Sequence, residues 1–186
     1  MRLLLPIRYR LDGIDLDVEV SSETIAEIQK LITQLRSDFG KDFIITLAPV
    51  ASALSPNDGR NISGFSYTTL EANCGTDINW YNAQFYSGFG SMKDTTDYDN
   101  IITGLPLDPS RLVAGTLSNK LNGSGWVELD TIKSTIRQLM QKYGDSFGGI
   151  GAWEYYNAQP DTDEPWTWAA VMKLAMINWK EVLAAG

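Results

Sequence analysis

The chain has 186 residues, of which 44% are hydrophobic, so it is long enough to bury a sizeable core within one globular domain. Its formal net charge of -8 argues against binding to nucleic acid or to an anionic membrane surface. The absence of histidine excludes a Ser-His-Asp triad in its usual form. The single cysteine, Cys74, has no partner for an internal disulfide and no cysteine or histidine neighbours for a zinc site.

The first residues give little information on location. One basic residue precedes the apolar run Leu3-Leu4-Leu5, which is shorter than the apolar region of about 7–15 residues in a signal peptide. No segment approaches the length of about 20 apolar residues that crosses a bilayer. The sequence therefore shows no signal peptide, predicts no membrane partner, and leaves the cellular location unknown.

Strand and helix patterns alternate along the chain. In order, the periodicity of apolar residues predicts a strand over 12–19, a helix over 25–35, a strand over 43–48, a helix over 65–72, a strand over 78–86, a helix over 97–103, a strand over 112–117, a helix over 129–143, a strand over 147–153 and a helix from 165 to 183. Ser21 or Ser22 is the expected cap of the first helix, and Gly40 its end. Such alternation predicts an α/β fold with a parallel sheet inside a layer of helices.

Polar and aromatic residues gather at the ends of these strands. Glu19 ends the first strand, Gln84 and Tyr86 end the third, and Trp153 ends the fifth. In β/α barrels, functional side chains lie at the C-terminal ends of the strands and on the loops that follow. These four residues are therefore candidates for one functional site.

The first strand carries an unusual concentration of acids. Side chains alternate between the two faces of a strand, so Asp15, Asp17 and Glu19 share one face, and the apolar residues between them share the other. A calcium loop beginning at Asp15 needs Gly at its sixth position and Glu at its twelfth, but Val20 and Ala26 stand there. A merely solvated acidic strand is the other alternative, and the apolar face argues against it. The pattern predicts no metal and no cofactor.

The stretch Asp12-Gly-Ile-Asp-Leu-Asp-Val-Glu19 resembles the signature of glycoside hydrolase family 18, which includes chitinases and endo-β-N-acetylglucosaminidases. Leu47-Ala48-Pro49 resembles the family's fifth barrel strand, Gln84-Phe85-Tyr86 its sixth, and residues 148–154 its eighth. The resemblance implies a partial (β/α)8 TIM barrel, with five parallel strand-helix units corresponding to strands four to eight. Residues 1–186 would form one catalytic domain without the family's first three units.

The resemblance also implies roles for the acids. Glu19 would be the general acid, Asp17 would orient the 2-acetamido group of the substrate, Asp15 would tune Asp17, and Asp12 would brace the strand beside the substrate site. This family belongs to the retaining glycosidases in which the acetamido oxygen of the substrate replaces the enzyme nucleophile. Carboxylates this close together are expected to push each other's pKa values apart.

Three further residues match substrate-binding positions of the family. Tyr86 would hydrogen-bond the acetamido oxygen, Gln84 would be its polar neighbour, and Trp153 would form the floor of the sugar subsite. Ser87 and Gly151 stand where the family often has Asn and Met. Neither departure touches the implied acid.

The implied function is hydrolysis of β-1,4 bonds between N-acetylglucosamine units, in chitin or in the N-glycan core. The alternatives are a non-catalytic protein that binds amino sugars and an inactive truncated fragment. An incomplete barrel leaves two strand edges open, which predicts self-association. An extracellular location follows from the resemblance alone.

Overall fold

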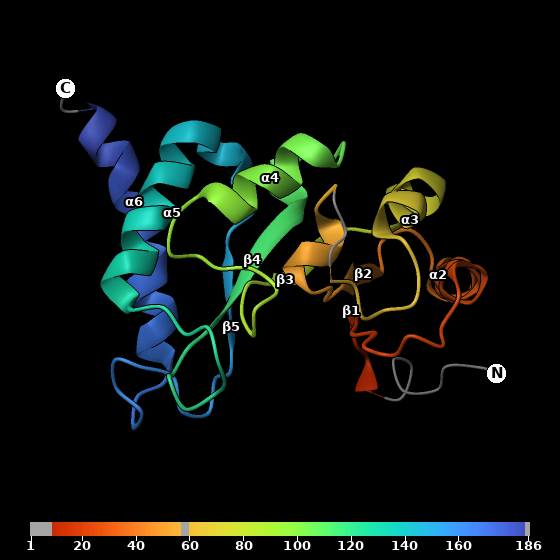
Figure 1. Cartoon of the computed structure of the whole chain (residues 1–186), viewed down its shortest axis with the longest axis horizontal. Helices are drawn as coiled ribbons and strands as arrows, with labels where there is room; N and C mark the ends of the chain where they lie inside the picture. The colour runs from red at the N-terminus through yellow and green to blue at the C-terminus, as the bar shows by residue number, and fades with distance from the viewer. Residues whose placement is uncertain (1–8, 57–59, 185–186) are drawn as a thin grey trace.

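Five strands and the helices between them make up the fold (Figure 1). The computed structural model describes residues 9–56 and 60–184, with side chains as far as Ile177. The strands and α-helices are β1 (Gly13–Leu16), α2 (Ile25–Phe39), β2 (Ile44–Leu47), α3 (Tyr67–Cys74), β3 (Trp80–Gln84), α4 (Thr96–Gly104), β4 (Leu112–Leu117), α5 (Leu129–Tyr143), β5 (Ile150–Trp153) and α6 (Trp166–Ala184). Each pattern predicted from the sequence corresponds to one of these elements.

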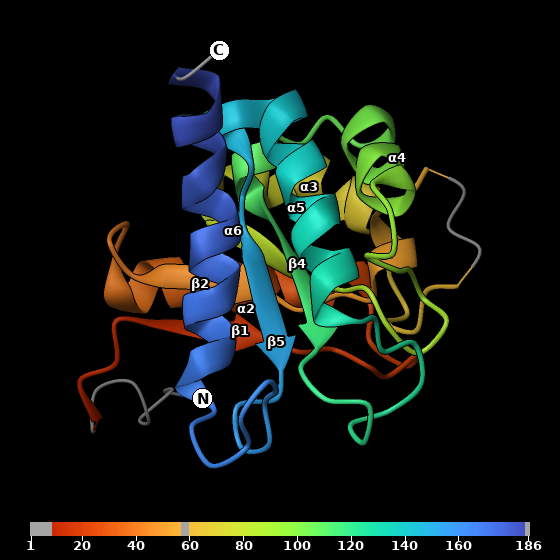
Figure 2. The ribbon, with the colours of Figure 1, turned by 90° about the vertical axis from the view of Figure 1, so that its left-hand side faces the viewer.

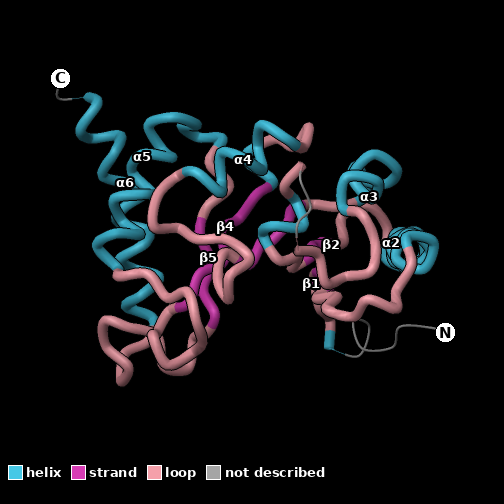
Figure 3. Tube along the Cα trace, in the orientation of Figure 1, coloured by secondary structure: helices cyan, strands magenta, loops and turns pink. Residues whose placement is uncertain are grey.

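The strands form one parallel sheet in the order β1-β2-β3-β4-β5. Its curvature and the helices outside it give five consecutive units of a partial (β/α)8 barrel, which confirms the predicted fold class (Figures 2 and 3). Because every strand runs in the same direction, the C-terminal ends all lie at one edge of the sheet. The loops that follow the strands therefore meet there.

Strand β1 is shorter than the predicted strand over 12–19. Its pairing with β2 runs from Gly13 opposite Ile44 to Leu16 opposite Leu47, and the last backbone bond is donated by the Ala48 nitrogen to the Leu16 oxygen, at 3.0 Å. Beyond Ala48 the next backbone bond of this segment runs to β3 instead, since the Gln84 nitrogen donates to the Pro49 oxygen at 2.8 Å. The acids beyond Leu16 consequently lie in the β1–α2 connection.

Helix α2 begins at a different cap from the one expected. Thr24, rather than Ser21 or Ser22, is the N-cap, and its hydroxyl accepts a hydrogen bond from the Glu27 nitrogen. The Glu27 carboxylate in turn accepts one from the Thr24 nitrogen at 2.9 Å. This reciprocal capping box satisfies donors at both positions, which a serine further upstream does not do.

A clamp of charged and polar groups holds the opposite, N-terminal side of the sheet together. Arg111, just before β4, forms an ion pair with Glu71 of α3 and donates to the carbonyl oxygens of Gly75 and Ile78 at 2.9 and 3.0 Å. The hydroxyl of the buried Tyr81 on β3 donates to the same Glu71 carboxylate at 2.7 Å. One helix and two strands are thus tied by a single carboxylate.

The helices of the described chain differ from membrane-spanning helices in length or composition. None of them is both long and apolar enough to cross a bilayer.

Candidate active site

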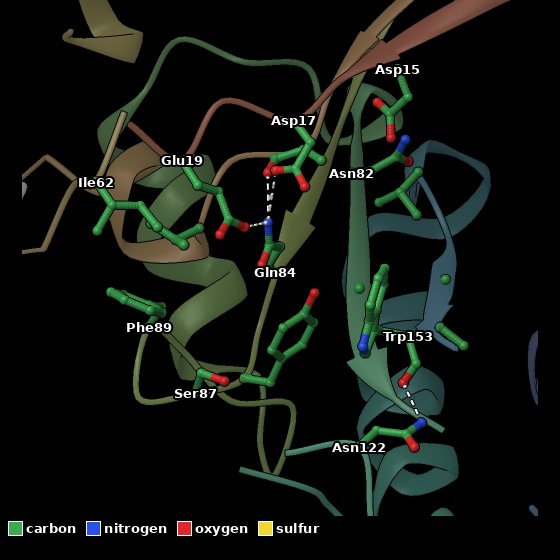
Figure 4. Close-up of a pocket in the computed structure, with 17 residues that line it drawn as sticks. Asp15, Asp17, Glu19, Ile62, Asn82, Gln84, Ser87, Phe89, Asn122 and Trp153 are labelled. Carbon is green, nitrogen blue, oxygen red and sulfur yellow. Dashed lines mark hydrogen bonds between the residues drawn. The ribbon is translucent and has the colours of Figure 1, made fainter. Parts of the chain in front are cut away.

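The C-terminal ends of the strands open onto a cleft of about 650 Å³ (Figure 4). Six of the residues predicted from the sequence line it: Asp15, Asp17, Glu19, Gln84, Tyr86 and Trp153. Among the described residues that line the cleft, three are acidic and none is basic. The cleft therefore concentrates negative charge without a neighbouring cation.

Asp12 is the one predicted residue that the fold does not bring into the cleft. It is exposed and comes just before β1 begins at Gly13. Its backbone oxygen accepts a hydrogen bond from the Ile44 nitrogen at 2.9 Å, which joins the start of β1 to β2.

Gln84 connects the acids across the sheet. It ends β3, and its amide nitrogen lies 2.9 Å from Glu19 Oε1, 2.8 Å from the Ala48 oxygen and 3.4 Å from Asp17 Oδ1 (Figure 4). A side-chain amide has two N–H donors, so the two shorter contacts are the main bonds and the contact with Asp17 is secondary. Gln84 thereby places the Glu19 carboxyl beside that of Asp17.

Asp17 is the cleft carboxyl whose pKa is raised. Burial is the main cause, followed by the negative charge of Glu19 and a hydrogen bond with its carboxyl, and then by the charge of Asp15. A hydrogen bond between two carboxyl groups requires a proton on one of them. Asp17 therefore holds its proton to a higher pH than an isolated aspartate does, with the Glu19 carboxyl beside it.

Tyr86 follows β3 and remains protonated at neutral pH. Burial raises the pKa of Tyr86 to about 12, and the negative charges of Glu19 and Asp17 add to the shift. Its hydroxyl is consequently available as a hydrogen-bond donor throughout the range in which the carboxyls titrate.

Trp153, at the end of β5, offers an open aromatic face. Its side chain is 54% exposed and borders the cleft on the side opposite the acids (Figure 4). Its backbone oxygen accepts hydrogen bonds from the Ser118 nitrogen at 2.9 Å and from the Asn122 amide at 3.0 Å. The loop that follows β4 thus fixes the backbone that carries the ring.

Sequence patterns missed several residues of the cleft. Asn122 lines the cleft and also holds the Trp153 backbone. The Asn157 amide donates to Asn122 Oδ1 at 2.6 Å, so this asparagine pair bridges the loops that follow β4 and β5. Asn82, two residues before Gln84 on β3 and therefore on the same face of the strand, lines the cleft as well. The alternation along β3 puts Asn82 on the same face as Gln84 and marks it as a weaker candidate, whereas no local signal marks the loop residue Asn122.

The described residues contain no group of three or more potential ligands placed to hold a metal ion.

Comparison with known proteins identifies the family. Among solved structures, a fungal endo-β-N-acetylglucosaminidase from glycosyl hydrolase family 18 is 47% identical, with a TM-score of 0.86 over 94% of this chain and 60% of that one. The chitinase ChiC from Aspergillus fumigatus is 44% identical, with a TM-score of 0.79 over 94% of this chain and 62% of that one. The chain belongs to glycoside hydrolase family 18.

One further solved structure shares the fold at lower sequence identity, and two other comparisons give no match. A family 18 chitinase from Pseudoalteromonas aurantia is 24% identical, with a TM-score of 0.72 over 91% of this chain and 63% of that one, and shows the fold alone. No protein-family model matches the chain, and no curated protein matches it. The chain spans about three-fifths of the length of the two family 18 proteins most similar in sequence among these.

Proposed function

We propose that this family 18 chain hydrolyses β-1,4 bonds between N-acetylglucosamine units of chitin or of the N-glycan core, with Glu19 as general acid. The observation that carries the proposal is the convergence of Asp17 and Glu19 on Gln84, in a cleft faced by Trp153. The similarity to an endo-β-N-acetylglucosaminidase and to a chitinase supports the substrate class.

The reaction needs one proton donor and no enzyme nucleophile. The acetamido oxygen of the substrate attacks C1 while the bond from C1 to the leaving oxygen breaks, and Glu19 gives its proton to that oxygen. Water then attacks C1 of the resulting oxazolinium ion and gives a proton back to Glu19. The acetamido group is restored, and the product retains its configuration.

Asp17 is suited to orient the acetamido group. An ionised Asp17 accepts a stronger, charge-assisted hydrogen bond from the acetamido N–H than a protonated one does, so the active form has Asp17 ionised and Glu19 protonated. Binding of the substrate and protonation of the general acid are therefore linked, and the negative charge of Asp15 adds to the rise in the pKa of Asp17.

Tyr86 and Trp153 complete the sugar site. The protonated Tyr86 hydroxyl donates a hydrogen bond to the acetamido oxygen and holds this oxygen in position to attack C1. The exposed face of Trp153 packs against the apolar face of the pyranose ring. Gln84 keeps Glu19 beside Asp17.

The experiment compares wild type with Glu19→Gln on a fluorogenic chitooligosaccharide and on a core-bearing N-glycan. We expect Glu19→Gln to lower kcat by about 10²–10⁴-fold, the usual contribution of a general acid. Glu128→Gln, at the exposed start of α5, is the matched control and should retain wild-type turnover. Unchanged activity in Glu19→Gln would remove Glu19 from this role, and wild-type binding without turnover would identify a non-catalytic amino-sugar binder instead.

A further inference from the structure

A buried threonine lies directly beneath the acids. Thr46 is on β2, is 3% exposed and is the register partner of Asp15 on β1. Its hydroxyl oxygen lies 2.6 Å from Asp15 Oδ1 and 3.4 Å from the Ile14 carbonyl oxygen. A hydroxyl has one hydrogen to donate, and the shorter contact, to a carboxylate, receives it.

The local sequence makes this hydroxyl conspicuous. Strand β2 reads Ile-Ile-Thr-Leu, so Thr46 is the only polar side chain in an otherwise apolar strand. Burying a hydroxyl is unfavourable unless it is hydrogen-bonded, and the β-branched side chain holds χ1 stiffly. A valine of the same shape would satisfy the packing of the strand, so packing does not account for the hydroxyl.

A second strand faces Asp15 from the other side. On β3 the Trp80 indole nitrogen donates to Asn82 Oδ1 at 3.0 Å, which fixes the orientation of that amide. The Asn82 side chain then points toward Asp15 (Figure 4). Asp15 is consequently held by Thr46 from β2 and faced by Asn82 from β3.

We propose that Thr46 is a positioning residue, which holds the Asp15 carboxylate where its negative charge acts on the Asp17–Glu19 pair. The meaning of this role for catalysis rests on the proposed function. The contact between Thr46 and Asp15 is independent of that function. Thr46 acts through Asp15 and touches neither Glu19 nor the sugar site, so it lies outside the roles implied by the family signature.

The charged and titratable groups around the pair are few. Asp15 acts on Asp17 from β1, Glu23 and Glu27 line an adjacent pocket with Asp17 and Glu19, and Tyr67 and Tyr86 come from α3 and from the loop after β3. Burial is the main cause that raises the pKa of each tyrosine to about 12, and the charges of Asp17 and Glu19 add to it. Both tyrosines stay neutral while the carboxyls titrate. Thr46 contacts Asp15, so a change at Thr46 can alter the pKa of Asp17 through the Asp15 charge.

The first test follows the side-chain carboxyl carbon of Asp17 by NMR while the whole 186-residue chain is titrated. In Thr46→Val, which keeps the shape and removes the hydroxyl, we expect the pKa of Asp17 to fall toward its ordinary value. Thr46→Ser, which keeps the hydroxyl, should restore the wild-type curve. Superimposable wild-type and Thr46→Val curves, or a rise of the Asp17 pKa in Thr46→Val, would overturn the proposal.

A double-mutant cycle separates positioning from packing. If Thr46 acts through Asp15, Thr46→Val should not change the Asp17 titration further once Asp15→Asn is present. An equal shift in both backgrounds would overturn the role. Should Thr46→Val not fold, Asp15→Asn and Thr46→Ala take its place, and the same relation is expected between them.

Turnover provides the catalytic readout. We expect Thr46→Val to lower kcat/KM by up to about 100-fold and to move the pH profile in the direction of the Asp17 shift, with Thr46→Ser close to wild type. If the wild-type chain shows no turnover, the proposed function is wrong. The NMR titration of Asp17 and the double-mutant cycle of Thr46 and Asp15 still test the positioning role in that case. A loss of turnover in Thr46→Val with an unaltered pH profile would indicate a structural role and overturn positioning.

Discussion

At the scale of single residues, the ionised form of Asp17 opposes folding. A carboxyl whose pKa is raised in the folded protein binds its proton more tightly there than in the unfolded chain. Its ionisation therefore lowers stability above the ordinary pKa, and the loss is greatest once pH has risen through the folded pKa. We expect Asp17→Asn to melt at a higher temperature than wild type at pH 7, measured by circular dichroism, while losing turnover.

The pH dependence gives this prediction its sign. The advantage of Asp17→Asn should shrink as pH falls toward the ordinary aspartate pKa of 3.8, because wild-type Asp17 is then protonated in both states. Asp130→Asn is the control with opposite sign, since Lys133 lowers the pKa of Asp130 and the substitution removes a favourable pair. A lower melting temperature for Asp17→Asn at pH 7 would contradict the prediction.

The hydroxyl of Tyr86 tests the substrate-assisted route. If it donates to the acetamido oxygen, Tyr86→Phe should lower kcat by about 10²-fold, comparable to the loss of one oxyanion-hole donor. Steady-state kinetics on a chitooligosaccharide would measure it. Tyr156→Phe, at a side chain 81% exposed and outside the cleft lining, is the matched control. Equal rates for Tyr86→Phe and wild type would exclude the donor role.

Residue types in short sequence patterns were enough to predict six residues of the cleft. Alternation placed Asp15, Asp17 and Glu19 together, and the rule for strand ends placed Gln84 and Trp153 with them. The rest depends on contacts between segments far apart in the chain. Thr46 reads as one more buried strand residue until the register sets it opposite Asp15, and Asn122 reads as an ordinary loop residue until β5 lies beside it.

At the scale of elements, the clamp at Arg111 sets a prediction for stability. Removing one partner of a largely buried ion pair leaves the other charge without compensation. Glu71→Ala should therefore lower the free energy of unfolding by about 3 kcal/mol, since it leaves the Arg111 charge without its carboxylate partner and also removes the acceptor of the Tyr81 hydroxyl. Urea denaturation measures the loss.

An exposed pair on α5 provides the comparison. Asp130, whose side chain is 92% exposed, pairs with Lys133 three residues later, and Asp130→Ala should cost much less than Glu71→Ala because solvent screens that pair. Equal losses at the two sites would show that the clamp contributes no more than a surface ion pair.

The order of elements was predictable because each helix and strand carries its own periodicity. Their ends were not. Strand β1 stops where its pairing with β2 ends, at Leu16 opposite Leu47, and α2 starts where Thr24 and Glu27 cap each other, so both limits depend on a partner rather than on the period of the pattern. The predicted strand over 12–19 was too long for this reason.

At the scale of the whole molecule, the sheet remains open. Within the described residues, β1 and β5 each pair with one neighbouring strand, so each offers a free edge. Helix α6, which covers β5 (Figure 2), leaves Trp166, Leu174 and Ile177 exposed by 55%, 57% and 43%. Their spacing puts these side chains on one side of the helix. This exposed apolar face and the free edges favour association between copies, whereas the net charge of -8 opposes it.

Salt decides which of these effects dominates. Added salt screens the repulsion between copies but leaves the burial of apolar surface intact, so self-association should strengthen as the ionic strength rises from about 0.01 M to 0.15 M. Sedimentation velocity across a concentration series measures it. Replacing the α6 face by the pair Leu174→Glu and Ile177→Lys should return the chain to a monomer, whereas Leu121→Ser, at an apolar residue 80% exposed on the β4–α5 loop, should not. A wild-type chain that stays monomeric at the higher salt would show that neither the α6 face nor the open edges drive association.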